Sequence, residues 1–163
     1  MNLFWVTSSM ALASRPRGND WLFDEMADLR RQKVDVLVSC LTTSEERELE
    51  LSEEERAATA SGMSFVRLPI EDRGVPTSRV AFDTVIDDLA QAQRTGRRVA
   101  IHCRQGLGRS PLVAAGLLVH AGLTPEAAWA VIGDRRGVPV PETDAQRNWV
   151  RLGDRRARAT QLS

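Results

Sequence analysis

A short apolar run that ends in a cysteine and a glycine loop constrains this chain more than any other feature. Residues 99–103 are small or β-branched up to the cysteine, apart from one histidine, which is typical of a buried strand. The loop that follows contains Gly106 and Gly108, and the long apolar run 111–120 predicts a buried helix. Pro111 fits the first turn of that helix, where its missing N–H costs nothing. The predicted order is therefore strand, cysteine, glycine loop, arginine, helix.

This order predicts a binding site for an anion with Cys103 at its floor. Backbone N–H groups of residues 104–109 can point inward, because Gly106 and Gly108 tolerate unusual dihedral angles. The positive end of the helix dipole points to the same place, and the planar guanidinium of Arg109 can hold two phosphate oxygens at once. The same field lowers the pKa of the cysteine and favours its thiolate. An ionised nucleophile that faces a bound phosphate predicts covalent phosphoryl transfer.

The glycine loop matches neither of two common nucleotide-binding motifs. It lacks the last glycine of a dinucleotide fingerprint and the Gly-Lys-Ser/Thr ending of a nucleotide P-loop. A strand cysteine taken alone is most often a small buried hydrophobic residue. Here, however, the segment HCRQGLGRS at 102–110 resembles the HCxxGxxR(S/T) signature of the cysteine-dependent tyrosine and dual-specificity protein phosphatases. It is most similar to the branch of the small cyclin-kinase-associated and cell-division-cycle phosphatases.

The resemblance extends from about residue 12 to residue 150 and implies one phosphatase domain over residues 1–163. The implied fold is a three-layer α/β domain in which helices flank a central, mostly parallel sheet. Strands that alternate with helices along the chain predict the same class, with right-handed crossovers. Sites in such sheets form at the carboxyl ends of strands, and both Cys103 and the loop 69–76 follow predicted strands.

The resemblance also assigns roles around the nucleophile. Cys103 takes the phosphoryl group from a phosphoester, and water then hydrolyses the phosphocysteine. His102 holds the loop and favours the thiolate, while Ser110 donates its hydroxyl to the departing sulfur. From the residues alone, His102 has only a structural role and Ser110 only caps the following helix. The implied phosphate-binding residues are Arg104, Gln105, Gly106, Leu107, Gly108 and Arg109.

Two further residues receive catalytic roles in this way. When a thiolate attacks phosphorus, the departing oxygen needs a proton, which a carboxylic acid can supply. The loop Pro-Ile-x-Asp-x-Gly-x-Pro at 69–76 is similar to the general-acid loop of the family and places Asp72, rather than Glu71, in the position of the acid. Without the resemblance, an aspartate beside glycine and proline is usually a turn former. The segment 142–146 is similar to the family segment whose glutamine positions water, which assigns that role to Gln146 against an ordinary place on a helix surface.

Predicted strands and helices alternate through the rest of the chain. Besides 99–103, we expect strands at 3–6, 34–40 and 63–68, with a loop at 14–18. Helices are expected to begin after side-chain caps. The expected caps are Asn19 or Asp20, Ser44, Ser52, Ser78, Thr124 and Thr143.

Within these helices the polar and apolar patterns predict which side chains are buried. Trp21 and Val80 are expected on apolar stripes, and Trp129 is expected in the core rather than at a ligand. Ser52 and Glu55 match a capping box. The acidic run 53–55 is interpreted as a solvated first helical turn and not as a metal site.

Composition excludes several other classes of function. The 22 basic and 22 acidic residues cancel, so no net field recruits nucleic acid or an anionic membrane. Two cysteines make no disulfide scaffold and favour a reducing cytoplasm. The amino terminus resembles no signal peptide, and no apolar stretch of about 18 residues is present, so we expect a cytoplasmic monomer. Two histidines and two cysteines give no zinc spacing, so no metal or cofactor is expected. The tail arginines are too few to indicate nucleic-acid binding: Arg151, Arg155, Arg156 and Arg158.

The expected partner is a phosphoprotein or phosphopeptide, and several alternatives stay open. No insertion resembles the phosphotyrosine-recognition loop of the tyrosine-specific enzymes, which favours a shallow pocket and broad specificity. The loop residues do not match the double-lysine loop of phosphoinositide phosphatases, and an RNA 5′-phosphate remains as a substrate class. A phosphate-binding protein without catalysis is the second function, and a rhodanese-like sulfurtransferase is the third.

Three more residues carry hypotheses of their own. Cys40 ends a strand expected beside that of Cys103, so a reversible Cys40–Cys103 disulfide would protect the nucleophile from over-oxidation. The alternative is a buried strand thiol. Arg15 and Arg17 would contact an anionic substrate if their loop reaches the pocket, and are otherwise solvated loop charges.

Overall fold

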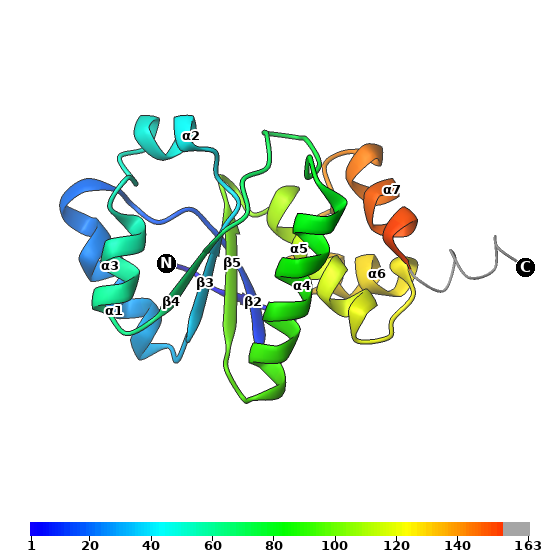
Figure 1. Cartoon of the computed structure of the whole chain (residues 1–163), viewed down its shortest axis with the longest axis horizontal. Coiled ribbons are helices and arrows are strands. Elements are labelled where there is room, and N and C mark those ends of the chain that lie inside the picture. The colour runs from blue at the N-terminus through cyan, green and yellow to red at the C-terminus, as the bar shows by residue number, and fades with distance from the viewer. Residues whose placement is uncertain (155–163) are drawn as a thin grey trace, which may run out of the picture.

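The computed structural model describes residues 1–154 and shows a five-stranded sheet between two layers of helices (Figure 1). The strand order is β1-β2-β5-β3-β4, in which β1 pairs antiparallel with β2 and the other pairs are parallel. The predicted three-layer α/β fold with a mostly parallel sheet is therefore confirmed. The strands are β1 (Phe4–Trp5), β2 (Met10–Ser14), β3 (Val36–Ser39), β4 (Ser64–Arg67) and β5 (Val99–Cys103).

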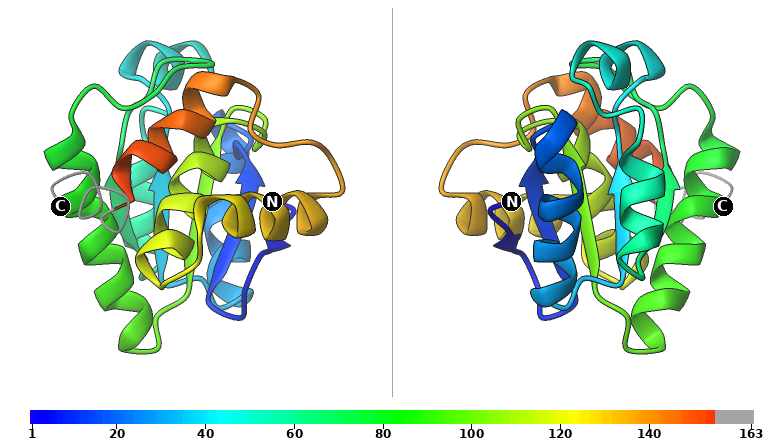
Figure 2. Two further views of the ribbon diagram at one scale, coloured as in Figure 1. Left: turned by 90° about the vertical axis from the view of Figure 1, so that its right-hand side faces the viewer. Right: turned by 90° about the vertical axis from the view of Figure 1, so that its left-hand side faces the viewer.

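Helices cover both faces of the sheet, as the views from either side show (Figure 2). The first layer contains α1 (Leu22–Arg31), α2 (Thr43–Glu48) and α3 (Glu54–Ala60), and the second contains α4 (Arg79–Arg94), α5 (Arg109–His120), α6 (Pro125–Arg136) and α7 (Asp144–Gly153). Each layer encloses its own apolar cluster. Of the tail arginines considered above, Arg155, Arg156 and Arg158 lie outside the described residues.

The central strand β5 contributes to both clusters. Side chains on a strand point alternately to opposite faces, so Ala100 packs in the α1–α3 cluster while Ile101 and Cys103 pack in the α4–α7 cluster. His102 shares the face of Ala100. The nucleophile and the histidine before it therefore lie on opposite sides of the sheet.

Helix α5 is the most buried helix of the second layer and begins directly below the glycine loop. It packs against α4, α6 and α7, and Pro111 lies in its first turn as predicted. The predicted caps of the other helices in this layer are confirmed. The side chains of Ser78, Thr124 and Thr143 accept hydrogen bonds from the backbone at the starts of α4, α6 and α7.

The sequence analysis missed β2, and its predicted loop 14–18 begins at the last residue of this strand. Residues 10–13 are fully buried between β1 and β5, and Ser14 is the last residue of the strand. Apart from one methionine and one leucine, these are small residues with no β-branched side chain among them. Short apolar runs of this kind do not distinguish strand from helix by periodicity.

Two predicted core residues are exposed. Trp21 is 54 % exposed in a 3₁₀ turn at Asn19–Trp21, where the Arg17 guanidinium stacks 4.3 Å from the ring centroid. That turn replaces the predicted side-chain cap before α1. Val80 is 76 % exposed because it lies on the solvent side of the first turn of α4.

The predicted capping box at Ser52 is also wrong. The box forms ten residues earlier, where Thr42 and Glu45 exchange side-chain and backbone hydrogen bonds at the start of α2. Helix α3 instead begins after Glu53, which makes no side-chain cap. Glu53 and Glu55 are exposed, as predicted for the solvated turn 53–55, but Glu54 is completely buried, which contradicts the prediction at that residue. Over residues 1–154 no helix combines the length and the apolar character needed to cross a bilayer.

Candidate active site

Cys103 ends β5 at the floor of the glycine loop and is almost fully buried. Its Sγ lies 3.3 Å from Ser110 Oγ, and the Gly106 N–H donates to it over 3.2 Å. Burial raises the pKa of the Cys103 thiol, but the hydrogen bonds of Ser110 and Gly106 and the charge of Arg109 outweigh it. The pKa therefore lies below its ordinary value, and the site favours a thiolate nucleophile as predicted.

The glycines of the loop are required by their surroundings. Gly106 has φ +74°, and a Cβ there would lie 2.8 Å from the carbonyl oxygen of Ala13. A Cβ on Gly108 would lie 2.3 Å from Glu142 Oε2 and 2.9 Å from Gln146 Nε2. The loop thus passes close to β2 on one side and to the segment before α7 on the other.

Arg109 is held rigidly beside the nucleophile. Its guanidinium is 1 % exposed and donates to both carboxylate oxygens of Glu45, over 2.7 and 3.0 Å. It also donates to the carbonyl oxygen of Ile70 over 2.9 Å. Burial lowers the pKa of Arg109, but the hydrogen bonds and charge of Glu45 raise it by more, so the pKa lies above its ordinary value. A fork fixed in this way presents a permanent positive charge to an anion in the loop.

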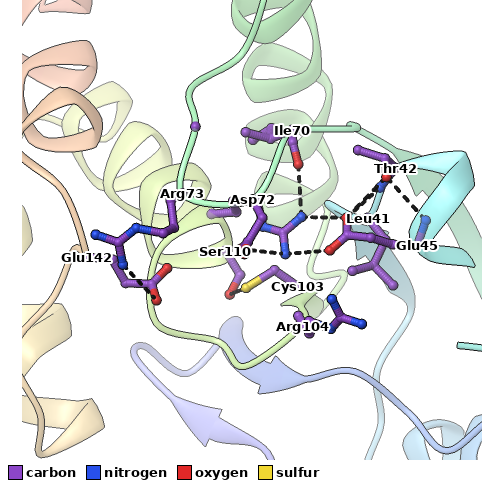
Figure 3. A network of polar contacts seen from close by, with 12 residues as sticks. Leu41, Thr42, Glu45, Ile70, Asp72, Arg73, Cys103, Arg104, Ser110 and Glu142 are labelled. Atoms are coloured by element: carbon purple, nitrogen blue, oxygen red, sulfur yellow. Dashed lines mark hydrogen bonds and ion pairs between the residues drawn. The ribbon is translucent and has the colours of Figure 1, made fainter. Parts of the chain in front are cut away.

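Asp72 reaches the same place from the loop between β4 and α4 (Figure 3). Its Oδ1 lies 3.3 Å from Arg109 Nη2, while its side chain is 61 % exposed. Glu71, the competing candidate for the acid, is not among the residues that line the Cys103 cavity. Of the two candidates weighed for the acid, Asp72 is therefore the one that lines the cavity.

One cavity of about 210 Å³ brings the predicted catalytic groups together. Cys103, Arg109 and Asp72 all line it. Three further residues of the predicted phosphate loop line it as well: Arg104, Gln105 and Leu107. Two lining residues were not singled out from the sequence: Arg73 and Glu142. Among residues 1–154 no group of three histidine, cysteine, aspartate or glutamate side chains could hold a metal ion.

The other predicted site residues lie behind this cavity. Ser110 contacts the sulfur from the first turn of α5, and His102 lies on the opposite face of the sheet. Gln146 is fully buried behind Gly108, where its amide closes the capping box of α7 and donates to the carbonyl oxygen of Gly74 over 3.1 Å. Its side chain is thus not on an ordinary helix surface.

Three residues that contact the loop were missed by the sequence analysis. Glu45 accepts hydrogen bonds from Arg109, and Glu142 lies close to Gly108. Arg136 donates to the carbonyl oxygen of Gly106 over 3.0 Å. Glu142 could have been found from its neighbourhood in the segment 142–146. Glu45 and Arg136 lie on other elements, and no motif spacing connects them to the loop.

The positions of Cys40, Arg15 and Arg17 bear on the proposed disulfide and on the proposed contact with an anionic substrate. Cys40 is fully buried in the same apolar cluster as Cys103, and both are free thiols. Burial and the nearby charge of Cys103 raise the pKa of the Cys40 thiol. Arg15 and Arg17 line a separate cavity of about 460 Å³ beside Trp21, outside the Cys103 cavity.

Comparisons with known proteins agree with this geometry. Residues 24–152 match the family described as "Dual specificity phosphatase, catalytic domain". The chain belongs to the dual specificity phosphatase family. It is 36 % identical to Cyclin-dependent kinase inhibitor 3 of Rattus norvegicus over 84 residues, which are 50 % of this chain and 39 % of that protein. It is 38 % identical to PRL-1 phosphatase of Drosophila melanogaster over 77 residues, 46 % of this chain and 43 % of that protein.

The match to these relatives therefore spans less than half of their length. At the level of structure, the kinase associated phosphatase with its catalytic cysteine replaced by serine superposes with a TM-score of 0.78. It shares 21 % identity and the match covers 94 % of this chain and 88 % of that one. This likeness supports the fold.

Proposed function

We propose that this chain is a cysteine-dependent phosphatase that hydrolyses phosphoesters of proteins or peptides through a phosphocysteine. The observation that carries the proposal is the convergence of Cys103 Sγ, the Arg109 guanidinium and the Asp72 carboxyl on one small cavity. A buried thiolate, a fixed cation and an exposed acid are the nucleophile, the oxyanion holder and the proton donor that phosphoester cleavage needs. The family membership supports the same chemistry.

The first step transfers the phosphoryl group to sulfur. Arg109 and the inward N–H groups of the loop bind the non-bridging phosphate oxygens. This places the phosphorus against Cys103 Sγ, with the leaving oxygen on the opposite side. The thiolate attacks phosphorus, a P–S bond forms, and the P–O bond to the leaving group breaks. Asp72 gives its proton to the departing oxygen, which leaves as an alcohol or phenol.

The second step returns the enzyme to its starting state. Water attacks the phosphocysteine, the P–S bond breaks, and the Asp72 carboxylate takes a proton from that water. Ser110 lies 3.3 Å from the sulfur and stabilises the thiolate as it leaves. The water approaches phosphorus from the side opposite the sulfur, and Gln146, whose amide lies beside Gly108, is the residue assigned to position it. The products are inorganic phosphate and the free thiolate.

Phosphoproteins are the proposed substrates, and the relatives matched are named as a kinase inhibitor and a phosphatase. The lowered pKa of Cys103 and its free thiol require reducing conditions. We infer from this a cytoplasmic location.

The test is hydrolysis of two aryl phosphates, p-nitrophenyl phosphate and phenyl phosphate, in EDTA. Wild type should turn over both, and Cys103→Ser should turn over neither. Asp72→Asn should lose roughly 10²–10⁴-fold on phenyl phosphate and less on p-nitrophenyl phosphate, because p-nitrophenolate needs a proton less. Cys40→Ser is the matched cysteine control and should keep full activity. Absence of turnover in freshly reduced wild type, with phosphate still bound, would establish the non-catalytic phosphate-binding function instead. Sulfur transfer from thiosulfate to cyanide without phosphatase activity would establish the sulfurtransferase.

A further inference from the structure

Behind the nucleophile, on the other face of the sheet, lies a buried pair that the proposed mechanism does not use. His102 Nε2 lies 2.8 Å from Glu54 Oε1, and both side chains are completely buried. Glu54 comes from the first turn of α3, whereas His102 is the penultimate residue of β5. The pair therefore connects a helix of the first layer to the strand that carries Cys103.

The pairing of the buried carboxylates singles out Glu54. Among the described residues four glutamates are buried, and three of them are paired with permanent cations. Glu25 contacts Arg17 and the amino terminus, Glu45 contacts Arg109, and Glu46 contacts Arg67. Neither oxygen of Glu54 accepts a hydrogen bond of regular geometry from any described group. His102, whose Nε2 lies 2.8 Å from Oε1, is its one charged neighbour there. Since an isolated buried carboxylate is strongly unfavourable, the histidine is what makes this glutamate tolerable.

Both ring nitrogens of His102 face acceptors. Nε2 faces the Glu54 carboxylate, and Nδ1 lies 3.4 Å from the carbonyl oxygen of Cys103. A carbonyl oxygen can only accept, so Nδ1 carries a proton, and a second proton on Nε2 would face the Glu54 carboxyl group. The surroundings of the ring therefore suit a doubly protonated imidazolium.

The charged groups that act on His102 are few. They are Glu54 on α3 and Cys103 in the same strand. The residues beside His102 on the neighbouring strands are Ala13 of β2 and Ser39 of β3, neither of which titrates. Burial lowers the pKa of His102, but the nearby charge of Glu54 outweighs it, so the pKa lies above its ordinary value. This direction agrees with the donor geometry.

We propose that Glu54 is a positioning residue that keeps His102 doubly protonated and thereby fixes the carbonyl group of Cys103 and places a positive charge next to the nucleophile. Glu54 touches neither the sulfur nor the cavity and acts only through His102. The inference rests on the proposed phosphatase function, but its consequence is a more reactive thiolate, which can be measured without any turnover.

The experiment compares Glu54→Gln with Glu55→Gln in a Cys40→Ser background. Glu55 is the matched control because it is the next residue of α3, is exposed, and pairs with Arg67 on the surface. The first readout is the rate of Cys103 alkylation by iodoacetamide as a function of pH. Loss of the imidazolium charge should raise the apparent pKa of the thiol and lower alkylation at neutral pH by roughly three- to tenfold. Glu55→Gln should leave the profile unchanged.

The second readout is proton NMR of the histidine rings, which is simple because the chain has two histidines, His102 and His120. The resonance that is lost in His120→Gln belongs to the surface histidine. In wild type the remaining resonance should titrate above the ordinary histidine pKa, and in Glu54→Gln it should move down or stop titrating.

Two results would overturn the proposal. One is a folded Glu54→Gln with an unchanged alkylation profile. The other, which needs no variant to fold, is a wild-type His102 that titrates below the ordinary histidine pKa. A wild type that shows the expected His102 and Cys103 behaviour but hydrolyses no aryl phosphate would refute the proposed function and leave the role of Glu54 standing.

Discussion

The carboxylate that holds Arg109 provides a severe test of how this site is built. Glu45→Gln removes its charge and keeps most of its shape. Glutamine still serves as the third residue of a capping box, so the start of α2 keeps its bonds to Thr42. If the amide oxygen remains at the cap, the amide nitrogen faces the Arg109 guanidinium, and two donors then oppose each other. The substitution thus isolates the ion pair from the fold of the helix.

The expected cost follows from the burial of the pair. Removing one partner of a buried ion pair costs about 3–5 kcal/mol, because the other charge is left uncompensated. Arg109 keeps the carbonyl oxygen of Ile70 at 2.9 Å and the exposed Asp72 at 3.3 Å, which places the cost near the lower end, about 3 kcal/mol. With a urea dependence of about 2 kcal/mol per molar, the unfolding midpoint should fall by about 1.5 M. A guanidinium displaced by about 1 Å should also lower kcat/KM by roughly 10²-fold.

The pH dependence of this loss has a definite sign. Burial raises the pKa of Glu45, but its hydrogen bonds to Arg109 and Thr42 and the charge of Arg109 lower it more, so the folded-state pKa lies below the ordinary value. The stabilisation is therefore fully present above the ordinary glutamate pKa and is lost as the pH falls through the lowered one. The difference in unfolding free energy between wild type and Glu45→Gln should be constant near pH 7 and should shrink in acid.

The assay is urea unfolding followed by tryptophan fluorescence, with p-nitrophenyl phosphate kinetics on the same samples. Glu46→Gln is the matched control, because Glu46 is the next residue of α2 and its partner Arg67 is 40 % exposed. Solvent screens that pair, so Glu46→Gln should change stability by about 1 kcal/mol or less and leave the kinetics unchanged. If Glu45→Gln unfolds within about 0.5 kcal/mol of wild type and keeps full activity, Arg109 does not depend on this carboxylate and the reasoning is wrong.

Two further predictions concern the glycine loop and the amino end of β3, at the opposite end of the sheet. Gly108→Ala places a Cβ 2.3 Å from Glu142 Oε2, so it should slow hydrolysis of the phosphocysteine and give a burst of nitrophenolate before a slower steady state. Gly133→Ala, whose Cβ meets nothing closer than 3.9 Å in α6, should keep the activity and gain about 0.5–1 kcal/mol in urea unfolding. Asp35→Asn weakens the acceptor for the Arg98 N–H at 2.8 Å and should cost about 1 kcal/mol at pH 7. Burial raises the pKa of Asp35, but this hydrogen bond and other contacts lower it by more, so the pKa lies below its ordinary value. The cost should therefore fade in acid. Equal stability of the two proteins at neutral pH would contradict the prediction.

The residues proposed as nucleophile, cation and acid could be located from the sequence because their signals are local or belong to a family motif. Cys103 and Arg109 lie within one nine-residue segment, whose strand, loop and helix fold as predicted. Asp72 depended on a second family motif, and the structure places it 3.3 Å from Arg109. Strand β2 could not be predicted, since its small apolar residues become a strand only through pairing with β5, some 90 residues away.

The same limit of local reasoning explains the error at the start of the first helical layer. Of the Ser/Thr-x-x-Glu patterns in this chain, one begins at Thr42 and another at Ser52, and each is a valid capping box by spacing. Only the first one forms. At the second, Glu54 is drawn inward to His102, and this tertiary contact replaces the local cap that the pattern predicts.

Two buried glutamates, one missed by the sequence analysis and one placed by it on a solvated turn, pair with the histidine and the arginine of the signature. Glu45 from α2 binds Arg109, and Glu54 from α3 binds His102, so each basic side chain has a buried carboxylate as its partner. On a helix surface these glutamates would be ordinary solvated charges, and their spacing along the chain contains no hint of the contact. They are buried because each one faces a basic side chain, Arg109 or His102. Burial of a carboxylate without such a partner would cost several kcal/mol. The motif thus identifies the reacting side chains of the site. The carboxylates that pair with its basic residues come from helices earlier in the chain, and these pairs become visible only when the layers are packed together.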